Sequence, residues 1–392
     1  MRRILFVISI FILFLFFACG KKPESEASVE IIDGIEHVHN TGTPLHPDSS
    51  VTFEEELSIG GEGYEMLSRP MQYIIDNEGS IYISDWQDQA IKVFDANGDF
   101  IRTIGRQGDG PGEFSNVGRM TFLPDGRLMV TDSRANRISL FDPEGAYLAS
   151  YHWTERLGRV HYATDSTCVM TVYAFDESAD PGAGGKLFVK SFDFDGNEIQ
   201  TFGEFKMAES RSHSVPSGET VIVVGISVPD PPQSIFAADP ARLRLYHCVN
   251  NEYKIEVFDL DGKVIRRFDR PYEPLPFTGE DAQEFRARYE DSRNEAIKKI
   301  VQEMPMPSVK TVTPQMRVDD AGNLWVETHE EKEEEDTVLT AYDIFNPDGY
   351  YEAKVWVEVK PEIFVNGKMY RFHTDEETGY RFVKRYNVVW DE

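Results

Sequence analysis

The sequence predicts an all-β fold: a six-bladed β-propeller, in which six four-stranded antiparallel units stand around a ring. Three observations predict it. A strand–turn–strand pattern recurs five times, a second hairpin pattern precedes each copy, and the two ends of the body supply complementary parts of a sixth unit. The chain has 392 residues, 41% of them apolar, which is enough to bury a core of this size.

The recurring hairpin has an aromatic residue, then Asp or Asn, two further residues, Gly and a second strand. A tight hairpin turn needs a residue that tolerates the left-handed conformation, and Gly supplies it. Upstream of each copy lies another strand–turn–strand, most clearly from Tyr73, Met120 and Met316. Two successive hairpins therefore form one blade. The five turn glycines are Gly98, Gly145, Gly196, Gly262 and Gly349.

The sixth blade is divided between the two ends of the body. The segment from Glu362 supplies three strands, and the segment from Phe53 matches the fourth strand of the first complete blade. Pairing these segments would close the ring and remove its free sheet edges. The sequence therefore predicts a propeller over residues 51–392, with its last blade closed by the N-terminal strand.

Residues 279–303 depart from the strand pattern. Thr278 resembles a helix cap, and Pro305 follows the end of the segment. We expect a small helical insertion between the fourth and fifth blades, at one end of the ring. Two roles remain open for it: a cover over the channel mouth, or a packed decoration. The apolar positions at helical spacing are Phe285, Tyr289, Ile297, Ile300 and Val301.

The N-terminal sequence predicts where in the cell the protein is located. Arg2 and Arg3 precede an apolar run that ends at Ala18, and Cys19 follows. Residues 1–18 resemble a bacterial lipoprotein signal peptide, which implies a lipid on Cys19 and a place in the bacterial cell envelope, facing the periplasm or the cell surface. An ordinary signal peptide with an incidental cysteine is the alternative. Residues 19–50 are rich in Pro, Gly, Ser and Glu, and predict a flexible tether.

The first two blades resemble NHL repeats. Residues 69–105 and 118–151 contain the D-x-x-G turn, the apolar strand ending in Asp, and the R-I-x-V-F-D type strand of that family. The body is similar to six-bladed propeller lipoproteins of bacteria. This resemblance specifies the fold and leaves the activity open, because propellers host enzymes, binding modules and scaffolds alike.

Composition excludes several classes of function. The formal net charge of −28 repels phosphate backbones, so nucleic acid is not an expected partner. Three cysteines are too few for a disulfide-stapled scaffold or a multi-cysteine metal cluster. We expect Cys168 and Cys248 to be buried free thiols, and we expect the protein to be a monomer with no cofactor.

Polar side chains at equivalent places on the innermost strands predict a ligand site at the channel mouth. Polar groups that converge at such a mouth are the default hypothesis for a small-molecule site, although a simply hydrated channel is the alternative. Arg69, Arg159 and Arg317 lie nearby in the repeat alignment and would suit a carboxylate or an acidic sugar. The predicted ligand-binding residues are Gln72, Arg119, His161, Gln315 and Lys360, with Ile235 at the equivalent place in blade four.

No catalytic motif stands out. Asp85 and Asp132 are better explained by hydrogen bonds in turns than by catalysis, and two D-x-D-G segments lack the full ligand series of a calcium loop. We therefore predict a non-catalytic binding scaffold, anchored to the membrane by its lipid, for a protein, peptide or glycan. The alternative is a metal-dependent lyase or lactonase-like hydrolase with calcium or zinc in the central channel.

Overall fold

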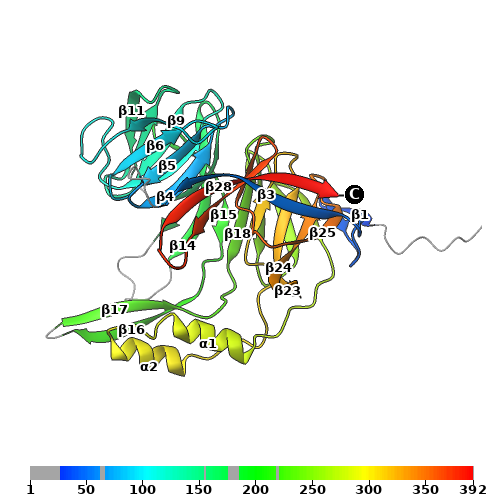
Figure 1. Ribbon diagram of the computed structural model, residues 1–392. Helices are drawn as coiled ribbons and strands as arrows, with labels where there is room; N and C mark the ends of the chain where they lie inside the picture. The colour runs from blue at the N-terminus through cyan, green and yellow to red at the C-terminus, as the bar shows by residue number, and fades with distance from the viewer. Residues whose placement is uncertain (1–26, 62–66, 154–155, 175–184, 218–219, 392) are drawn as a thin grey trace, which may run out of the picture.

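The computed structural model describes residues 27–61, 67–153, 156–174, 185–217 and 220–391 (Figure 1). The predicted signal peptide (1–18) and the predicted lipid-attachment residue Cys19 lie outside these ranges. Six sheets form the propeller, and a separate two-stranded sheet stands apart from them with two helices. The prediction of an all-β six-bladed propeller is confirmed.

Blades one to three follow one another along the chain, each with four antiparallel strands. Blade one comprises β4 (Pro70–Ile75), β5 (Ile81–Asp85), β6 (Ala90–Phe94) and β7 (Phe100–Ile104). Blade two comprises β8 (Val117–Phe122), β9 (Leu128–Asp132), β10 (Arg137–Phe141) and β11 (Tyr147–His152). Blade three comprises β12 (Arg156–Ala163), β13 (Thr167–Ala174), β14 (Lys186–Asp193) and β15 (Glu198–Phe205).

Blades four to six complete the ring. Blade four comprises β18 (Ser234–Asp239), β19 (Arg244–Val249), β20 (Lys254–Phe258) and β21 (Val264–Asp269). Blade five comprises β22 (Met316–Val318), β23 (Leu324–Glu334), β24 (Thr337–Phe345) and β25 (Tyr351–Val357). Blade six comprises β26 (Ile363–Val365), β27 (Lys368–Thr374), β28 (Arg381–Asp391) and β3 (Ser50–Gly60).

The ring is closed where the two ends of the body meet. β3 pairs antiparallel with β28, so that Phe53 lies opposite Val388 and Ile59 opposite Val383. The two strands run side by side across the molecule in Figure 1, blue beside red. The predicted closure of the last blade by an N-terminal strand is confirmed.

Apolar packing between blades holds the ring together. Each of the six interfaces between neighbouring blades contains one cluster of buried apolar side chains. At the closing interface, Ile59 and Val383 of blade six pack with Ile81 and Ile83 of blade one. Because strand side chains alternate between two faces, each blade contributes one apolar face to each neighbour.

The turns follow the predicted chemistry. All five predicted turn glycines have positive φ, between 72° and 92°. Asp85 and Asp132 are fully buried, and their carboxylates accept backbone N–H groups from the loop that enters each blade, including those of Arg69 and Ser115. This network stabilises loops and agrees with the prediction of a structural role.

The predicted tether is wrong for part of its length. Two strands, β1 (Ser28–Ile32) and β2 (Ile35–His39), lie within residues 19–50, and β2 adds parallel to β21 at the outer edge of blade four. Asn40 then links blades four and five, since its amide donates to the carbonyls of Asp269 and Gly349. This segment is therefore part of the folded body.

The helical insertion is confirmed and is larger than predicted. The predicted range 279–303 holds α1 (Gly279–Ala287), capped by Thr278, and α2 (Glu295–Glu303). A hairpin that the sequence analysis did not predict, β16 (Ser210–Ser217) with β17 (Thr220–Ser227), precedes blade four. We call β16, β17, α1 and α2 the arm. An apolar cluster that includes Ile226, Phe285 and Val301 unites the arm, which projects from the ring in Figure 1.

Within the described residues, neither helix has the length and apolar character of a membrane span.

Candidate functional site

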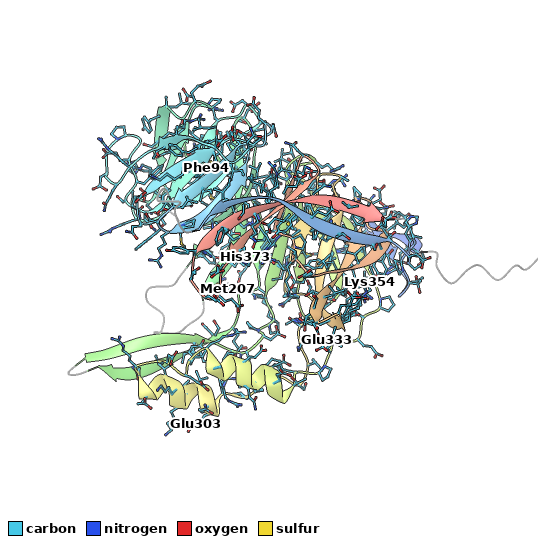
Figure 2. The ribbon with its side chains drawn as sticks, in the orientation of Figure 1. Phe94, Met207, Glu303, Glu333, Lys354 and His373 are labelled. Atoms are coloured by element: carbon cyan, nitrogen blue, oxygen red, sulfur yellow. The ribbon has the colours of Figure 1, made fainter. Side chains whose placement is uncertain are left out.

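A pocket of about 350 Å³ opens where the arm joins the ring, between blades three, four and five. We call it the mouth pocket. Its inner wall includes residues of the strands β12, β18 and β22, and its outer wall includes the segment that leads from β15 to the arm, on which Met207 is labelled in Figure 2. The lining residues are Arg159, His161, Thr171, Tyr173, Leu187, Lys206, Met207, Ala208, Gln233, Ser234, Ile235, Phe236, Pro314, Gln315 and Arg317.

The mouth pocket is cationic although the protein is strongly acidic. Arg159, Arg317 and Lys206 line it, and no Asp or Glu is found among the lining residues that the structure describes. The whole chain carries 68 acidic residues against 40 Lys and Arg, so a lining with three cations and no carboxylate departs sharply from the average surface. Fixed positive charge of this kind raises the local concentration of anions.

Arg159 stands close to two like charges. Although its side chain is exposed, burial of the guanidinium group and the like charges of Arg317 and Arg119 lower its pKa to about 10. Burial also lowers the pKa of Arg317, while the carboxylates of Glu362 and Glu327 act in the opposite direction. At neutral pH a guanidinium group with a pKa of about 10 stays protonated, so Arg159 and Arg317 bring positive charge from blades three and five to the mouth.

His161 is buried in the wall rather than solvated. It is only 7% exposed, its Nε2 lies 2.9 Å from the Thr171 hydroxyl, and its ring packs 5.3 Å from Phe236. Burial and the charge of Arg159 lower its pKa to about 3, so the imidazole is neutral. Its Nδ1 is buried and has no hydrogen-bond partner among the described residues. Because Nδ1 is closed to solvent and Nε2 contacts Thr171, His161 contributes its ring to the wall of the pocket.

Gln72 has a structural role instead. Its side-chain carbonyl accepts the Met120 N–H at 2.8 Å, and its amide lies 3.4 Å from the Met120 carbonyl. This pair of contacts joins the inner strands of blades one and two, β4 and β8. Arg69, which the repeat alignment placed near the mouth, stacks 4.5 Å above the Trp86 ring and does not line the pocket.

Lys360 lines a second pocket, which shares Pro314 with the mouth pocket. This pocket has a volume of about 450 Å³ and lies between α1 and blade five; we call it the helix pocket. The Lys360 ammonium lies 2.8 Å from Glu327, whose other oxygen accepts the Tyr342 hydroxyl. The lining residues are Pro229, Asp230, Phe277, Asp281, Glu284, Phe285, Arg288, Lys310, Pro314, Glu327, Thr328, His329, Glu331 and Lys360.

The opposite end of the channel differs in charge. There a cavity of about 970 Å³ is lined by residues from all six inner strands or their following turns. Asp239, Asp319 and Asp320 are among them, and the described part of the lining holds no Lys, Arg or His. The Asp239 and Asp319 carboxylates are already engaged, by Arg242 and by Trp325 respectively. The two mouths of the channel therefore have opposite polarity.

The structure brings together some of the predicted ligand-binding residues. His161 and Gln315 line the mouth pocket, Arg119 acts electrostatically on Arg159, and Lys360 lines the neighbouring helix pocket. Lys206 and Gln233 also line the mouth pocket, and the alignment of the repeats did not predict them. Each lies just outside a strand, beyond the positions that the repeat alignment compared.

Metal-ligand clusters and reactive thiols are absent from the residues that the structure describes. In the part of the chain that the structure describes, no three His, Cys, Asp or Glu side chains are grouped so as to hold a metal ion. Cys168 and Cys248 are free and buried, as predicted, and burial raises each thiol pKa to about 12. A thiol with such a pKa is a poor nucleophile at neutral pH.

Comparison with known proteins supports the fold. A family model described as DUF5128, 6-bladed beta-propeller, matches residues 65–147. No curated protein matches the chain.

Solved structures with similar folds are distant in sequence. A member of the DUF4221 family from Bacteroides vulgatus is 11% identical, with a TM-score of 0.48 over 87% of this chain and 99% of that one. Virginiamycin B lyase from Staphylococcus aureus is 9% identical, with a TM-score of 0.37 over 86% and 99%. Regucalcin, a calcium-binding protein from Agrobacterium tumefaciens, is 11% identical, with a TM-score of 0.31 over 82% and 92%. These likenesses carry no argument about activity.

Proposed function

We propose that the protein is a lipid-anchored, extracytoplasmic propeller that binds an anionic ligand at the arm-side mouth of its channel and does not transform it. The observation that carries the proposal is the mouth pocket, where Arg159, Arg317 and Lys206 are the charged residues of the described lining, on a chain of net charge −28. Guanidinium groups bind carboxylates through paired hydrogen bonds, which supports a carboxylate-bearing ligand.

The neutral groups of the pocket complement its charges. Gln233 and Gln315 offer amides, and Ser234 and Thr171 offer hydroxyls. A ligand that combines a carboxylate with hydroxyl groups would satisfy both sets. Such a pocket binds by fixed charge and hydrogen bonding and needs no nucleophile or metal.

The anchoring part of the proposal rests on the N-terminal sequence. Cys19 follows a basic start and an apolar run, as in bacterial lipoprotein signals, and β1 begins at Ser28, nine positions later. The folded body would then lie close to the membrane, with blade four near the anchor. The metal-dependent lyase or hydrolase alternative has no specific observation in its favour.

The test is equilibrium binding by the full-length lipidated protein in detergent, measured by calorimetry at constant ionic strength. Galacturonate is compared with galactose, which lacks only the carboxylate, and citrate and phosphate serve as further anions. We expect at least one anion to bind and galactose not to bind. Arg159→Gln should abolish binding, whereas Arg69→Gln, an exposed arginine outside the pocket, should preserve it. Failure of all three anions to bind, or equal binding to both variants, would contradict the proposal.

A further inference from the structure

The cavity at the end of the channel opposite the mouth pocket, which we call the acidic cavity, has largely apolar walls. Its volume of about 970 Å³ is that of a small-molecule site. Ile74 on β4, Phe122 on β8, Val318 on β22 and Phe364 on β26 line it, and all four are only half-buried. Apolar surface that remains in contact with water is stabilised when a ligand covers it.

The charged part of this lining is acidic. Asp239 ends β18, and Asp319 and Asp320 form the turn after β22. The Arg242 guanidinium lies 3.0 Å from the Asp239 carboxylate and balances its charge. Among the described residues, no Lys, Arg or His forms an ion pair with Asp319 or Asp320. These two carboxylates therefore give the acidic cavity an excess of negative charge.

Asp320 is the carboxylate best placed to contact a ligand. Its side chain is exposed, its Oδ2 accepts the Gly367 N–H at 2.5 Å, and its Oδ1 has no hydrogen-bond partner in the described part of the chain. Asp319 is already occupied, because its Oδ2 accepts the Asn323 amide and the Trp325 indole N–H at 3.0 Å each. Partial burial and the like charge of Asp319 raise the pKa of Asp320, which the Gly367 N–H opposes. A cation beside Asp320 would offset that repulsion.

We propose that the acidic cavity is a second ligand site, specific for an organic ammonium ion whose charged group is bound by Asp320 and whose apolar body covers the half-buried walls. This site lies at the other end of the channel from the mouth pocket and does not depend on the proposed function. The two ends of the channel then bind ligands of opposite charge.

A metal ion fits the acidic cavity less well. Calcium takes about six to eight oxygen ligands, and no three His, Cys, Asp or Glu side chains are grouped so as to hold a metal in the ranges that the structure describes. An organic ammonium needs a single carboxylate for a charge-assisted hydrogen bond. The rest of its affinity comes from apolar contact, which a bare metal ion cannot make.

The test compares three ligands that share an indole ring and a two-carbon chain. Tryptamine ends in an ammonium group, tryptophol in a hydroxyl and indole-3-propionate in a carboxylate. Each is titrated into the full-length protein in detergent by calorimetry, and a titration into detergent alone is subtracted. We expect tryptamine to bind about tenfold or more tightly than tryptophol, and indole-3-propionate to bind most weakly.

Asp320→Asn removes the charge and keeps an oxygen that can accept the Gly367 N–H. It should reduce the preference for tryptamine over tryptophol to about threefold or less and leave tryptophol binding unchanged. Asp125→Asn is the matched control, because Asp125 lies in the turn after β8, accepts the Arg127 N–H and does not line the cavity. It should leave tryptamine binding unchanged.

Three results would overturn the second site: no binding of tryptamine, equal binding of the three ligands, or an equal loss of tryptamine binding in the two Asp variants. Arg159→Gln separates this inference from the proposed function, since Arg159 lines the mouth pocket and not the acidic cavity. It should abolish anion binding and leave tryptamine binding unchanged. A loss of tryptamine binding in Arg159→Gln would place the ligand at the wrong end of the channel and contradict the inference.

Discussion

The guanidinium groups of Arg159, on β12 of blade three, and Arg317, on β22 of blade five, meet across the channel mouth, and the charge of Arg317 lowers the pKa of Arg159. Like charges in proximity are costly unless something compensates them. Among the residues that the structure describes, no Asp or Glu lines the mouth pocket, although the carboxylates of Glu327 and Glu362 act electrostatically on Arg317. An anion bound between the two guanidinium groups would reduce their repulsion.

A first prediction separates binding from stability. Arg159→Gln removes one of the neighbouring like charges, so we expect the free energy of unfolding without ligand to stay within about 0.5 kcal/mol of wild type or to increase. Urea denaturation of the ligand-free proteins measures this. A clear loss of stability would mean that Arg159 supports the fold and that favourable contacts in the folded protein balance its charge.

A second prediction concerns acid. The folded-state pKa of His161 is about 3, below its ordinary value of 6.5, so between these pH values the unfolded chain binds more protons than the folded one. The contribution of His161 to stability is therefore complete above about pH 6.5 and is lost as the pH falls toward 3. Urea midpoints at pH 7 and pH 5 should differ less for His161→Gln than for wild type. An equal or larger difference in the variant would contradict the prediction.

A third prediction tests the closure of the ring. Ile59 on β3 is completely buried against blade one, and Ile59→Ala should cost about 2–5 kcal/mol of stability. Ile199→Ala is the matched control, because that side chain is 54% exposed on β15 and should change stability by less than about 0.5 kcal/mol. Similar small losses in both variants would show that β3 does not close the propeller.

A fourth prediction concerns the base of the arm. Arg270 follows β21, and its guanidinium donates to the buried Asp343 carboxylate and stacks on Tyr253, Tyr272 and Tyr351. Arg270→Ala leaves the Asp343 charge buried, and should cost about 3–5 kcal/mol.

The control for Arg270→Ala is Arg106→Ala, which breaks the exposed ion pair with Glu113. This substitution should cost about 1 kcal/mol of stability or less. Thermal melting of both variants measures the difference. If Arg270→Ala and Arg106→Ala have the same melting temperature, the buried ion pair contributes no more to stability than the exposed one.

A fifth prediction tests the anchor. Cys19→Ala removes the proposed lipid-attachment site, so the protein should leave the membrane fraction while its melting temperature is unchanged. Cell fractionation with Cys168→Ala as the control measures this, because that buried thiol cannot carry a lipid. Retention of the Cys19 variant in the membrane pellet would contradict lipid anchoring.

The ring could be predicted from sequence because its repeats are local. Each hairpin carries its own Gly turn and alternating apolar pattern, and the ends of the body matched because β3 resembles β7. The β1–β2 hairpin was missed although Asp33 and Gly34, both with positive φ, form the two-residue turn that Asp-Gly favours. The polar composition around this hairpin suggested a tether, and only pairing with β21 in blade four reveals its role.

The candidate functional site was harder to predict from the sequence than the fold. Alignment of the repeats located His161, Gln315 and the nearby arginines, but it could not show that the Gln72 amide is fixed to Met120 or that His161 is buried. Lys206 enters the mouth pocket from the segment that leads to the arm, which lies outside every repeat. Contacts between elements far apart in the chain decide these roles.

A crystal structure of the protein with galacturonate tests the central claim most directly. We expect density for the carboxylate between Arg159 and Arg317 in the mouth pocket. Density for the ligand at the acidic opposite mouth, or anywhere other than these two guanidinium groups, would contradict the account.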